Sequence, residues 1–252
     1  MTLNPQLALR RAFGRQMICQ LSRLVNDRFQ QRLAADVESE QRFRDQVSQK
    51  FPDDPVAGEE LGSDPGADQN GWLIDPLDGS TNHSQGIPLF AVSIAYRTDG
   101  VTLLGWVSDP VRGEWFEGLK GKGVLCGGSI SPSGYPGKVP MICLSPRWRG
   151  AHPTWREHLP RGLKQRSIGS IALEMAWIAA GRVDAAAWYR TQPWDVCAGE
   201  LLIQESGGKV IDIPNGGPGE KIAGGAGATS LLNALQAAID NGGRDARNKD
   251  PV

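Results

Sequence analysis

The chain has 252 residues, of which 40% are hydrophobic and 22% are charged, and its formal net charge is −1. This is the composition of an ordinary globular protein, and the length suffices for one large core or two smaller subdomains. A nearly neutral charge argues against binding of nucleic acid or an anionic membrane, and no apolar run approaches the roughly 20 residues of a membrane-spanning helix.

Two helices followed by a group of strands are predicted for the first half of the chain. Apolar residues recur at helical spacing from residue 7 to about residue 35, which indicates an amphipathic helix, and a second helix covers about residues 38–50. Strands separated by turns that contain Gly are predicted at 72–74, 91–96, 103–108 and 113–119. Strands gathered after helices are typical of an α+β arrangement.

Helices and strands alternate in the second half, which is typical of an α/β arrangement. Strands are predicted at 141–144, 184–189 and 209–213, and helices at 170–180 and 196–206. Residues 129–138 are rich in Ser, Gly and Pro and are the best candidate for a subdomain boundary. We therefore expect an N-terminal α+β subdomain over residues 1–135 and a C-terminal α/β subdomain over residues 136–252, with a flexible tail from about residue 241.

The most informative stretch is Trp72 to His83, where an apolar run that indicates a buried strand leads into two carboxylates three residues apart. Asp75 and Asp78 follow this strand, and two carboxylates at a strand end can bind a hard cation. Residues 79–81, Gly-Ser-Thr, are predicted to begin a helix whose free backbone N–H groups accept a phosphate. The alternative is an ordinary Asp-Gly turn, since both residues are common in turns.

Two further acidic motifs flank this stretch. Glu59 and its neighbour Glu60 follow Gly58, although adjacent glutamates are usually just solvated surface. Downstream, Asp195 lies near the start of a predicted helix, where by itself it could be an ordinary N-cap. Together, the three acidic motifs in this order indicate one shared site.

In these motifs the chain resembles the inositol monophosphatase family, which are magnesium-dependent, lithium-sensitive sugar-phosphate phosphatases. Asp75 to His83 is similar to the family's Asp-Pro-(Ile/Leu)-Asp-Gly-Thr-x-Asn-aromatic motif with two changes, and Trp194 to Gly199 matches Trp-Asp-x-x-Ala-Gly in full. A further stretch, Arg166 to Ala172, resembles Arg-Ser-x-Gly-(Ser/Thr)-Ala-Ala. The resemblance implies a layered αβαβα sandwich whose two subdomains share one active site.

The resemblance also implies an activity, the hydrolysis of a small-metabolite phosphomonoester by a metal-activated water. The ester would be inositol phosphate-like or a sugar phosphate. Two Mg²⁺ about 3.5–4 Å apart can serve such a reaction, and Mg²⁺ prefers oxygen ligands. The metal ligands carried over from the family are Glu59, Asp75, the Leu77 carbonyl, Asp78 and Asp195.

The catalytic residues that the resemblance implies are Glu59, Asp78 and Ser80. Ser80 stands in place of the family's threonine, whose hydroxyl orients the attacking water together with Glu59, and it retains that hydroxyl. The implied substrate-binding residues are Gly79, Ser80, Thr81, Gly169, Ser170, Trp188, Arg190 and Asp195. The first three of these would bind the phosphate through their N–H groups.

Two departures from the family lie around the first helix and the main motif. The family has a lysine and a Thr-x-x-Asp strand between its first two helices, whereas here Arg32 to Asp36 follows the first helix directly. Asp36 falls at the family's aspartate, so the sequence leaves open a third, weakly held metal. His83 replaces an aromatic residue, and we interpret it as a structural substitute.

The third departure concerns the substrate. Trp188 stands where the family has a glutamate that contacts inositol hydroxyls, and losing that carboxylate weakens selection for a bare cyclitol. Trp188 can stack on a ring, and Arg190 can face a second anionic group, or equally lie on the surface near a dimer interface. Relatives act on inositol phosphate, fructose bisphosphate, histidinol phosphate and phosphoadenosine phosphate, and the sequence does not choose the substrate.

A second function class stays open, a catalytically weak regulatory protein that binds metal or phosphate on the same scaffold. The shortened link after the first helix and the changes at Ser80 and His83 favour it, whereas the retained carboxylates argue against it. The expected partners are a small phosphorylated metabolite and, because the family is often dimeric, a second copy of the chain. No nucleic-acid or membrane partner is expected.

Cysteine and histidine suggest no competing chemistry. The four cysteines are scattered without a CxxC pair, which indicates reduced thiols in a cytoplasmic protein. Cys197, close to Asp195, is interpreted as a small buried helix residue rather than a nucleophile. The three histidines do not cluster, so a zinc site is disfavoured.

Overall fold

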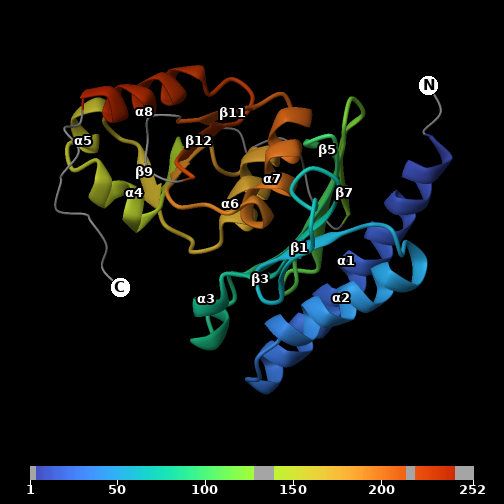
Figure 1. Cartoon of the computed structure of the whole chain (residues 1–252). Helices are drawn as coiled ribbons and strands as arrows, with labels where there is room; N and C mark the ends of the chain where they lie inside the picture. Colours follow the sequence, from blue (N-terminus) through green and yellow to red (C-terminus); the bar gives the residue numbers. More distant parts are fainter. Residues whose placement is uncertain (1–3, 128–138, 214–218, 242–252) are drawn as a thin grey trace.

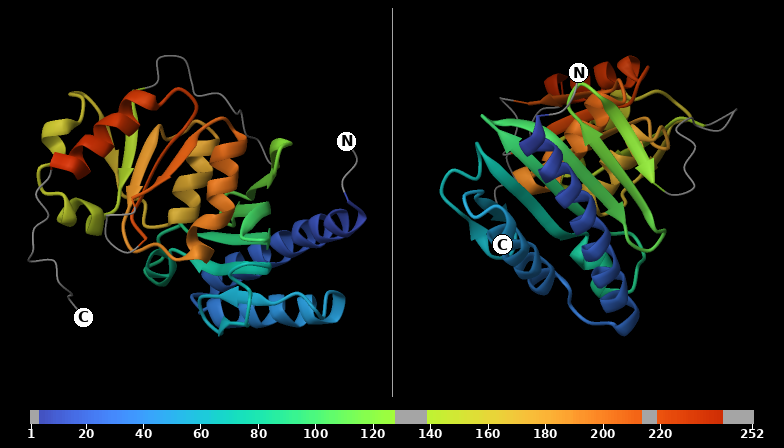
Figure 2. Two further views of the ribbon diagram at one scale, coloured as in Figure 1. Left: turned by 45° about the horizontal axis from the view of Figure 1, so that its top comes forward. Right: turned by 90° about the vertical axis from the view of Figure 1, so that its right-hand side faces the viewer.

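The computed structural model describes residues 4–127, 139–213 and 219–241. Helices and sheets alternate in five layers, helix–sheet–helix–sheet–helix, as Figures 1 and 2 show. The predicted αβαβα sandwich is therefore confirmed. The predicted subdomain boundary at 129–138 and the tail beyond residue 241 lie outside the described residues. None of the helices in the described ranges is long and apolar enough to cross a membrane.

Two helices form the first layer and cover one face of the first sheet. They are α1 (Pro5–Gln31) and α2 (Asp36–Lys50). Helix α1 ends earlier than predicted because Arg32 adopts a left-handed conformation, with φ of 57°, and its N–H turns back to the carbonyls of Arg28 and Phe29. Helix α2 begins at Asp36, so only residues 32–35 link the two helices.

The first sheet has seven strands in the order β2-β1-β3-β4-β5-β6-β7. All neighbouring strands in it are antiparallel except β1 and β3, which are parallel. The strands are β1 (Val56–Gly58), β2 (Gly62–Ser63), β3 (Gly71–Asp78), β4 (Ala91–Thr98), β5 (Val101–Asp109), β6 (Glu114–Leu119) and β7 (Gly123–Gly127). The four strands that we predicted here correspond to β3 through β6.

The second sheet has five strands in the order β11-β12-β10-β8-β9. Its strands are β8 (Met141–Leu144), β9 (Lys164–Arg166), β10 (Ala185–Trp188), β11 (Lys209–Asp212) and β12 (Lys221–Gly224). Helices α6 (Ile171–Ala179) and α7 (Pro193–Glu205) lie between the two sheets, as Figure 2 shows. The outer layer contains α4 (Pro146–Ala151), α5 (Trp155–His158) and α8 (Thr229–Asn241), and the short helix α3 (Ser80–Ser84) follows β3.

Alternating side chains on the strands explain how each sheet separates two apolar cores. In β3, Trp72 and Ile74 pack in the core below α1 and α2, whereas Leu73 packs in the core shared with α6 and α7. In β8, Ile142 faces the outer helices and Cys143 faces α6. Because successive strand residues point to opposite faces, the central strands are apolar on both sides.

Candidate active site

A cavity of about 210 Å³ lies where segments from distant parts of the chain meet at the end of β3. It is lined by Glu59, Asp75, Leu77, Asp78, Gly79, Ser80, Thr81, Gly169 and Asp195. All five residues predicted as metal ligands are among them. The fold therefore brings the three acidic motifs to one cavity.

The strand β3 carries Asp75 and Asp78 into this cavity through a local irregularity in its pairing with β4. Asp75 pairs with Ser93 of β4 and Asp78 with Ala91, so three steps along β3 oppose two along β4. The N–H of Leu77 donates to Oδ1 of Asp75 at 2.9 Å. This bulge lets both carboxylates line the same cavity, where a regular strand would direct residues three apart to opposite faces.

The carboxylate of Asp78 is held by the start of α6. Its Oδ2 accepts hydrogen bonds from the Ser170 hydroxyl and from the N–H of Ala172, both at 2.6 Å. Ser170 is also the N-cap of α6, because its Oγ accepts from the N–H of Leu173. One residue of the first sheet is thereby joined to the middle helical layer.

Asp195 is the third residue of α7 and not its N-cap. The N-cap is Gln192, whose N–H donates to Oδ2 of Asp195 at 2.8 Å in a capping box. The carbonyl of Trp194 accepts from the hydroxyl of Ser93 in β4 at 3.2 Å, which ties the start of α7 to the first sheet. The predicted helix start at residue 196 was therefore three residues too late.

Glu59 reaches the cavity from the turn between β1 and β2. Gly58, the last residue of β1, pairs in parallel with Ile74 of β3. Glu59 follows Gly58 directly in the turn, and Asp75 follows Ile74 in β3, so the parallel pairing delivers both residues to the same end of the sheet. Glu60 is exposed and does not line the cavity.

The four carboxylates repel one another. In the described ranges none of them forms an ion pair with Lys, Arg or His. Burial, followed by repulsion from Asp78 and Glu59, raises the pKa of Asp75 well above its ordinary value. Burial also raises the pKa of Asp195 to about 7, and partial burial together with Asp78 raises the pKa of Glu59.

This donor set fits Mg²⁺, because uncompensated carboxylate oxygens are the ligands that hard divalent cations prefer. A cation would relieve the repulsion that raises these pKa values. Among the described residues, no group of three Asp, Glu, His or Cys side chains is already arranged to hold a metal ion. Mg²⁺ usually retains several waters and needs few protein ligands.

The start of α3 contributes backbone N–H groups to the same cavity. Gly79 precedes the helix with φ of 95°, a conformation that favours glycine, and Ser80 and Thr81 form the first turn. The first N–H groups of a helix have no partner within it and can bind an anion. Asn82 anchors this turn, since its amide donates to the carbonyls of Leu89 and Ile168 at 2.7 and 2.8 Å.

Three of the predicted substrate-binding residues are not among those that line the cavity. Trp188 is completely buried, and its Nε1–H donates to Oε2 of Glu174 at 2.6 Å, so its ring is not available to stack on a substrate. Ser170 is also buried, and its hydroxyl is used by Asp78. In this structure the indole of Trp188 and the hydroxyl of Ser170 therefore have their partners inside the protein. Arg190 is half-buried and is not among the residues that line the cavity.

Sequence reasoning missed Glu174, which organises the segment that lines the cavity. Its Oε1 accepts from the N–H of Ile168 at 2.8 Å, one residue before Gly169, while its Oε2 binds Trp188. Burial raises the pKa of Glu174 to about 7. In the sequence, Glu174 is an acidic residue in an otherwise apolar predicted helix, and nothing in that pattern indicates its partners.

Residues around the shortened link lie next to the cavity. A second cavity of about 640 Å³ shares Leu77 and Ser80 with it and is also lined by Arg32 and Asp36. Asp36 lies close enough to contribute to the raised pKa of Glu59. His83 packs against the rings of Phe29 and Phe90, which fits its interpretation as a substitute for an aromatic residue.

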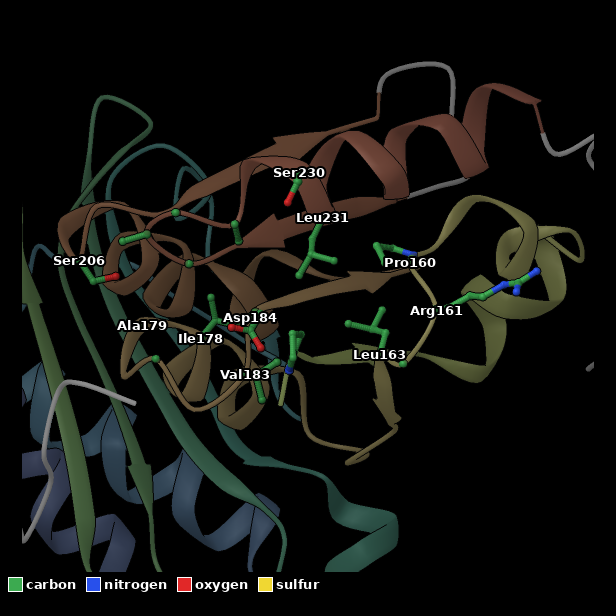
Figure 3. Close-up of a pocket in the computed structure, with 17 residues that line it drawn as sticks. Pro160, Arg161, Leu163, Ile178, Ala179, Val183, Asp184, Ser206, Ser230 and Leu231 are labelled. Carbon is green, nitrogen blue, oxygen red and sulfur yellow. The ribbon is translucent and has the colours of Figure 1, made fainter. Parts of the chain in front are cut away.

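Neither a further cavity in the second sheet's region nor Cys197 offers a competing site. A cavity of about 670 Å³ lies at the opposite end of the second sheet, beside Asp184 and Val183 before β10, and in Figure 3 the Arg161 side chain points away from it. Its carboxylate, Asp184, accepts from the N–H of Met141 at 2.7 Å. Burial raises the pKa of the Cys197 thiol to about 11, so this thiol stays protonated near neutral pH.

Comparison with known proteins shows which proteins the chain is similar to. A sequence model of the inositol monophosphatase family matches residues 8–241. The inositol-1-monophosphatase of Caulobacter vibrioides is 34% identical over 191 residues, which cover 71% of this chain and 74% of that protein. The Nus factor SuhB of Pasteurella multocida is 35% identical over 196 residues, which cover 72% of this chain and 71% of that protein.

A solved structure supports the fold over most of the chain. SuhB of Mycobacterium tuberculosis superposes with a TM-score of 0.76 at 28% sequence identity. The superposition covers 93% of this chain and 98% of that protein. The likeness therefore includes both sheets and the helical layer that carries Asp195.

Proposed function

The chain belongs to the inositol monophosphatase family, and we propose from this that it is a Mg²⁺-dependent phosphatase of small phosphorylated metabolites. The observation that carries the proposal is the convergence of Glu59, Asp75, Asp78 and Asp195 with the start of α3 in one cavity. Carboxylates for a divalent cation and N–H groups for a phosphate are thus side by side. A phosphate ester is the substrate class that needs both.

Two Mg²⁺ ions, when bound, would neutralise the phosphoryl oxygens and stabilise the leaving alkoxide. We assign Glu59, Asp75 and the Leu77 carbonyl to the first ion, and Asp75, Asp78 and Asp195 to the second. Asp36 is the candidate ligand for a third, weaker ion, since it lines the adjoining cavity.

The remaining roles belong to the protein's own donors and acceptors. The Ser80 hydroxyl and the Glu59 carboxylate are proposed to orient the attacking water and to accept its proton. The N–H groups of Gly79, Ser80 and Thr81 are proposed to bind the phosphate oxygens. Gly169 lies beside Gly79 in the lining of the same cavity and is proposed to contact the bound ester.

The substrate is proposed to be a sugar phosphate or a related ester rather than one selected by cyclitol hydroxyls. Trp188 occupies the position of the family's hydroxyl-binding glutamate and is buried against Glu174. Without a carboxylate at this position, a substrate that lacks the matching hydroxyl leaves no buried acceptor unpaired, so the site discriminates less between different alcohols. Fructose bisphosphate and histidinol phosphate are the specific alternatives to inositol phosphate.

A regulatory role is the second candidate, favoured by one observation. Several relatives, including the protein from Pasteurella multocida, carry the name Nus factor SuhB and not the name of an enzyme. This chain would then retain the fold and bind metal or phosphate with little turnover. Association into homodimers is compatible with either function and is tested by light scattering after size-exclusion chromatography.

The deciding experiment is phosphate release from a panel of phosphomonoesters with and without Mg²⁺, and with added Li⁺. Turnover that needs Mg²⁺ and falls with Li⁺ supports the phosphatase. The panel contains inositol phosphate, fructose bisphosphate, histidinol phosphate and p-nitrophenyl phosphate. If Mg²⁺ binds by calorimetry and no ester is hydrolysed, the phosphatase proposal is wrong and the regulatory one is favoured.

A further inference from the structure

We infer that Glu40 and Arg44 of α2 are positioning residues that fix the turn carrying Glu59, so that Glu59 can act as a metal ligand. The inference rests on the proposed metal site and concerns residues that none of the acidic motifs contains. Glu40 is completely buried, and Arg44 is mostly buried beside it. A buried charged pair four residues apart on a helix needs a reason beyond helix stability, because desolvation is costly.

The Glu40 carboxylate binds the backbone directly after Glu59. Its Oε2 accepts from the N–H of Glu60 at 2.8 Å, and its Oε1 accepts from the N–H of Leu61 at 3.2 Å. Two consecutive N–H groups of the β1–β2 turn are thereby held by one rigid helical side chain. This determines the path of the backbone at the residue before them, Glu59.

Arg44 holds the same carboxylate and both strands that flank the turn. Its Nε donates to Oε1 of Glu40 at 2.8 Å. Its guanidinium also donates to the carbonyl of Val56 in β1 at 3.3 Å and to the carbonyl of Gly62 in β2. The pair therefore closes a network around the turn, in which each charged group is satisfied by the other and by backbone.

Gly58 shows how closely the carboxylate approaches the motif. A Cβ placed on Gly58 would lie 2.4 Å from both Cδ and Oε1 of Glu40, which is closer than such atoms can approach. The glycine of the Gly-Glu-Glu motif is thus required by Glu40 and not by the cavity. Because β1 also pairs in parallel with β3, the turn is fixed on one side by Asp75's strand and on the other by Glu40.

Glu40→Gln tests this inference with little change in volume. Glutamine keeps one acceptor oxygen but presents an NH₂ group to the second N–H, so one of the two turn hydrogen bonds is lost. We expect Mg²⁺ affinity, measured by calorimetry without substrate, to fall about 10–100-fold, as is usual when a residue that orients a metal ligand is changed. In the metal-free protein, the N–H groups of Glu60 and Leu61 should exchange with solvent faster by NMR.

Glu38→Gln is the matched control. Glu38 lies on the same helix and pairs with Arg28 on the surface, away from the turn. This variant should keep wild-type Mg²⁺ affinity and wild-type exchange at Glu60 and Leu61. If Glu40→Gln does not fold, Glu40→Asp and Arg44→Lys keep the charges while moving the carboxylate or the guanidinium, and the same two measurements apply.

The outcomes separate this inference from the proposed function. Wild-type Mg²⁺ affinity and unchanged exchange in a folded Glu40→Gln protein would overturn the inference. If the wild-type chain itself does not bind Mg²⁺, the proposed function fails and the inference, which rests on it, fails with it. Faster exchange at Glu60 and Leu61 would then mark Glu40 as a purely structural residue of the turn.

Discussion

The hydroxyl of Ser170 donates to Oδ2 of Asp78 across 92 residues of sequence, at a distance of 2.6 Å. Asp78 ends β3 in the first sheet, and Ser170 begins α6 in the layer between the sheets. The hydrogen bond therefore joins the two halves of the chain at the edge of the carboxylate cavity. A residue predicted to touch the substrate instead orients a proposed metal ligand.

Ser170→Ala should lower both stability and activity. It removes the N-cap of α6 and a buried hydrogen bond of Asp78, and each loss typically costs about 1 kcal/mol of unfolding free energy. Urea unfolding and phosphate release with Mg²⁺ measure the two effects. Ser145→Ala is the matched control, because Ser145 caps α4 by accepting from the N–H of Trp148 and does not line the carboxylate cavity. Equal activity losses in both variants would contradict the role of Ser170.

Asp195→Asn should abolish turnover while the fold stays intact. The remaining carbonyl oxygen can still accept the hydrogen bond from Gln192, so α7 keeps its capping interaction. Loss of a charged ligand of the second proposed Mg²⁺ should reduce kcat by about 100-fold or more. Phosphate release is compared with far-UV circular dichroism, and Asp45→Asn on the surface of α2 serves as control. A folded Asp195→Asn protein with normal activity would refute the assignment.

Trp188→Phe should destabilise the protein without changing the order of preferred substrates. The variant removes the indole donor to Oε2 of Glu174 and so weakens the hydrogen bonding of that buried carboxylate, at a cost of about 1–3 kcal/mol. Trp106→Phe is the comparison, since its indole partner Glu117 is also bound by Arg11 and Arg15 and should tolerate the loss better. A reordered substrate panel for Trp188→Phe would mean that the indole does contact substrate.

The protonation of Glu174 should make the stability of the protein depend on pH between about 4.5 and 7. Burial raises its pKa from 4.5 to about 7 in the folded protein, so between these values the folded state holds a proton that the unfolded chain has lost. The stability contributed by protonated Glu174 is full below about pH 4.5 and is lost as pH rises through 7. Glu174→Gln should therefore lower the free energy of unfolding, relative to wild type, by less at pH 8 than at pH 5.

Urea unfolding of both proteins across this range tests the prediction. The glutamine lacks the titration but makes poorer contacts with the N–H donors of Ile168 and Trp188, which adds a constant cost. The pKa of Glu174 is therefore read from how the difference in unfolding free energy between the two proteins changes with pH. A difference independent of pH would show that Glu174 titrates near its ordinary value in the folded protein.

Local patterns predicted much of the architecture. The strand at 141–144 has the predicted bounds, and the central strands of the first sheet were found because their apolar runs are short and end at turns. The strands β1, β2, β7, β9 and β12 were missed, because runs of two to five residues are too short to show a reliable alternation. Helix α8 was also missed, although Leu231, Leu235 and Ile239 are buried at helical spacing.

The residue types and their local order determined the chemistry of the candidate site. Carboxylates bind hard cations, and the free N–H groups of a Gly-Ser-Thr helix start bind anions. Both preferences are properties of the residues themselves, so they can be predicted without knowing the fold. The bulge in β3 was not predicted, yet it leaves the same two carboxylates on one cavity.

Only the tertiary structure decided which partners these groups and their neighbours take. Glu40 binds N–H groups 20 residues away, and the indole of Trp188 turns from the predicted substrate position to Glu174, 14 residues away on another element. Neither contact follows from a periodicity or a motif. A buried polar group pairs with whatever donor or acceptor the packing of layers brings within about 3 Å, and that choice is made in space and not along the chain.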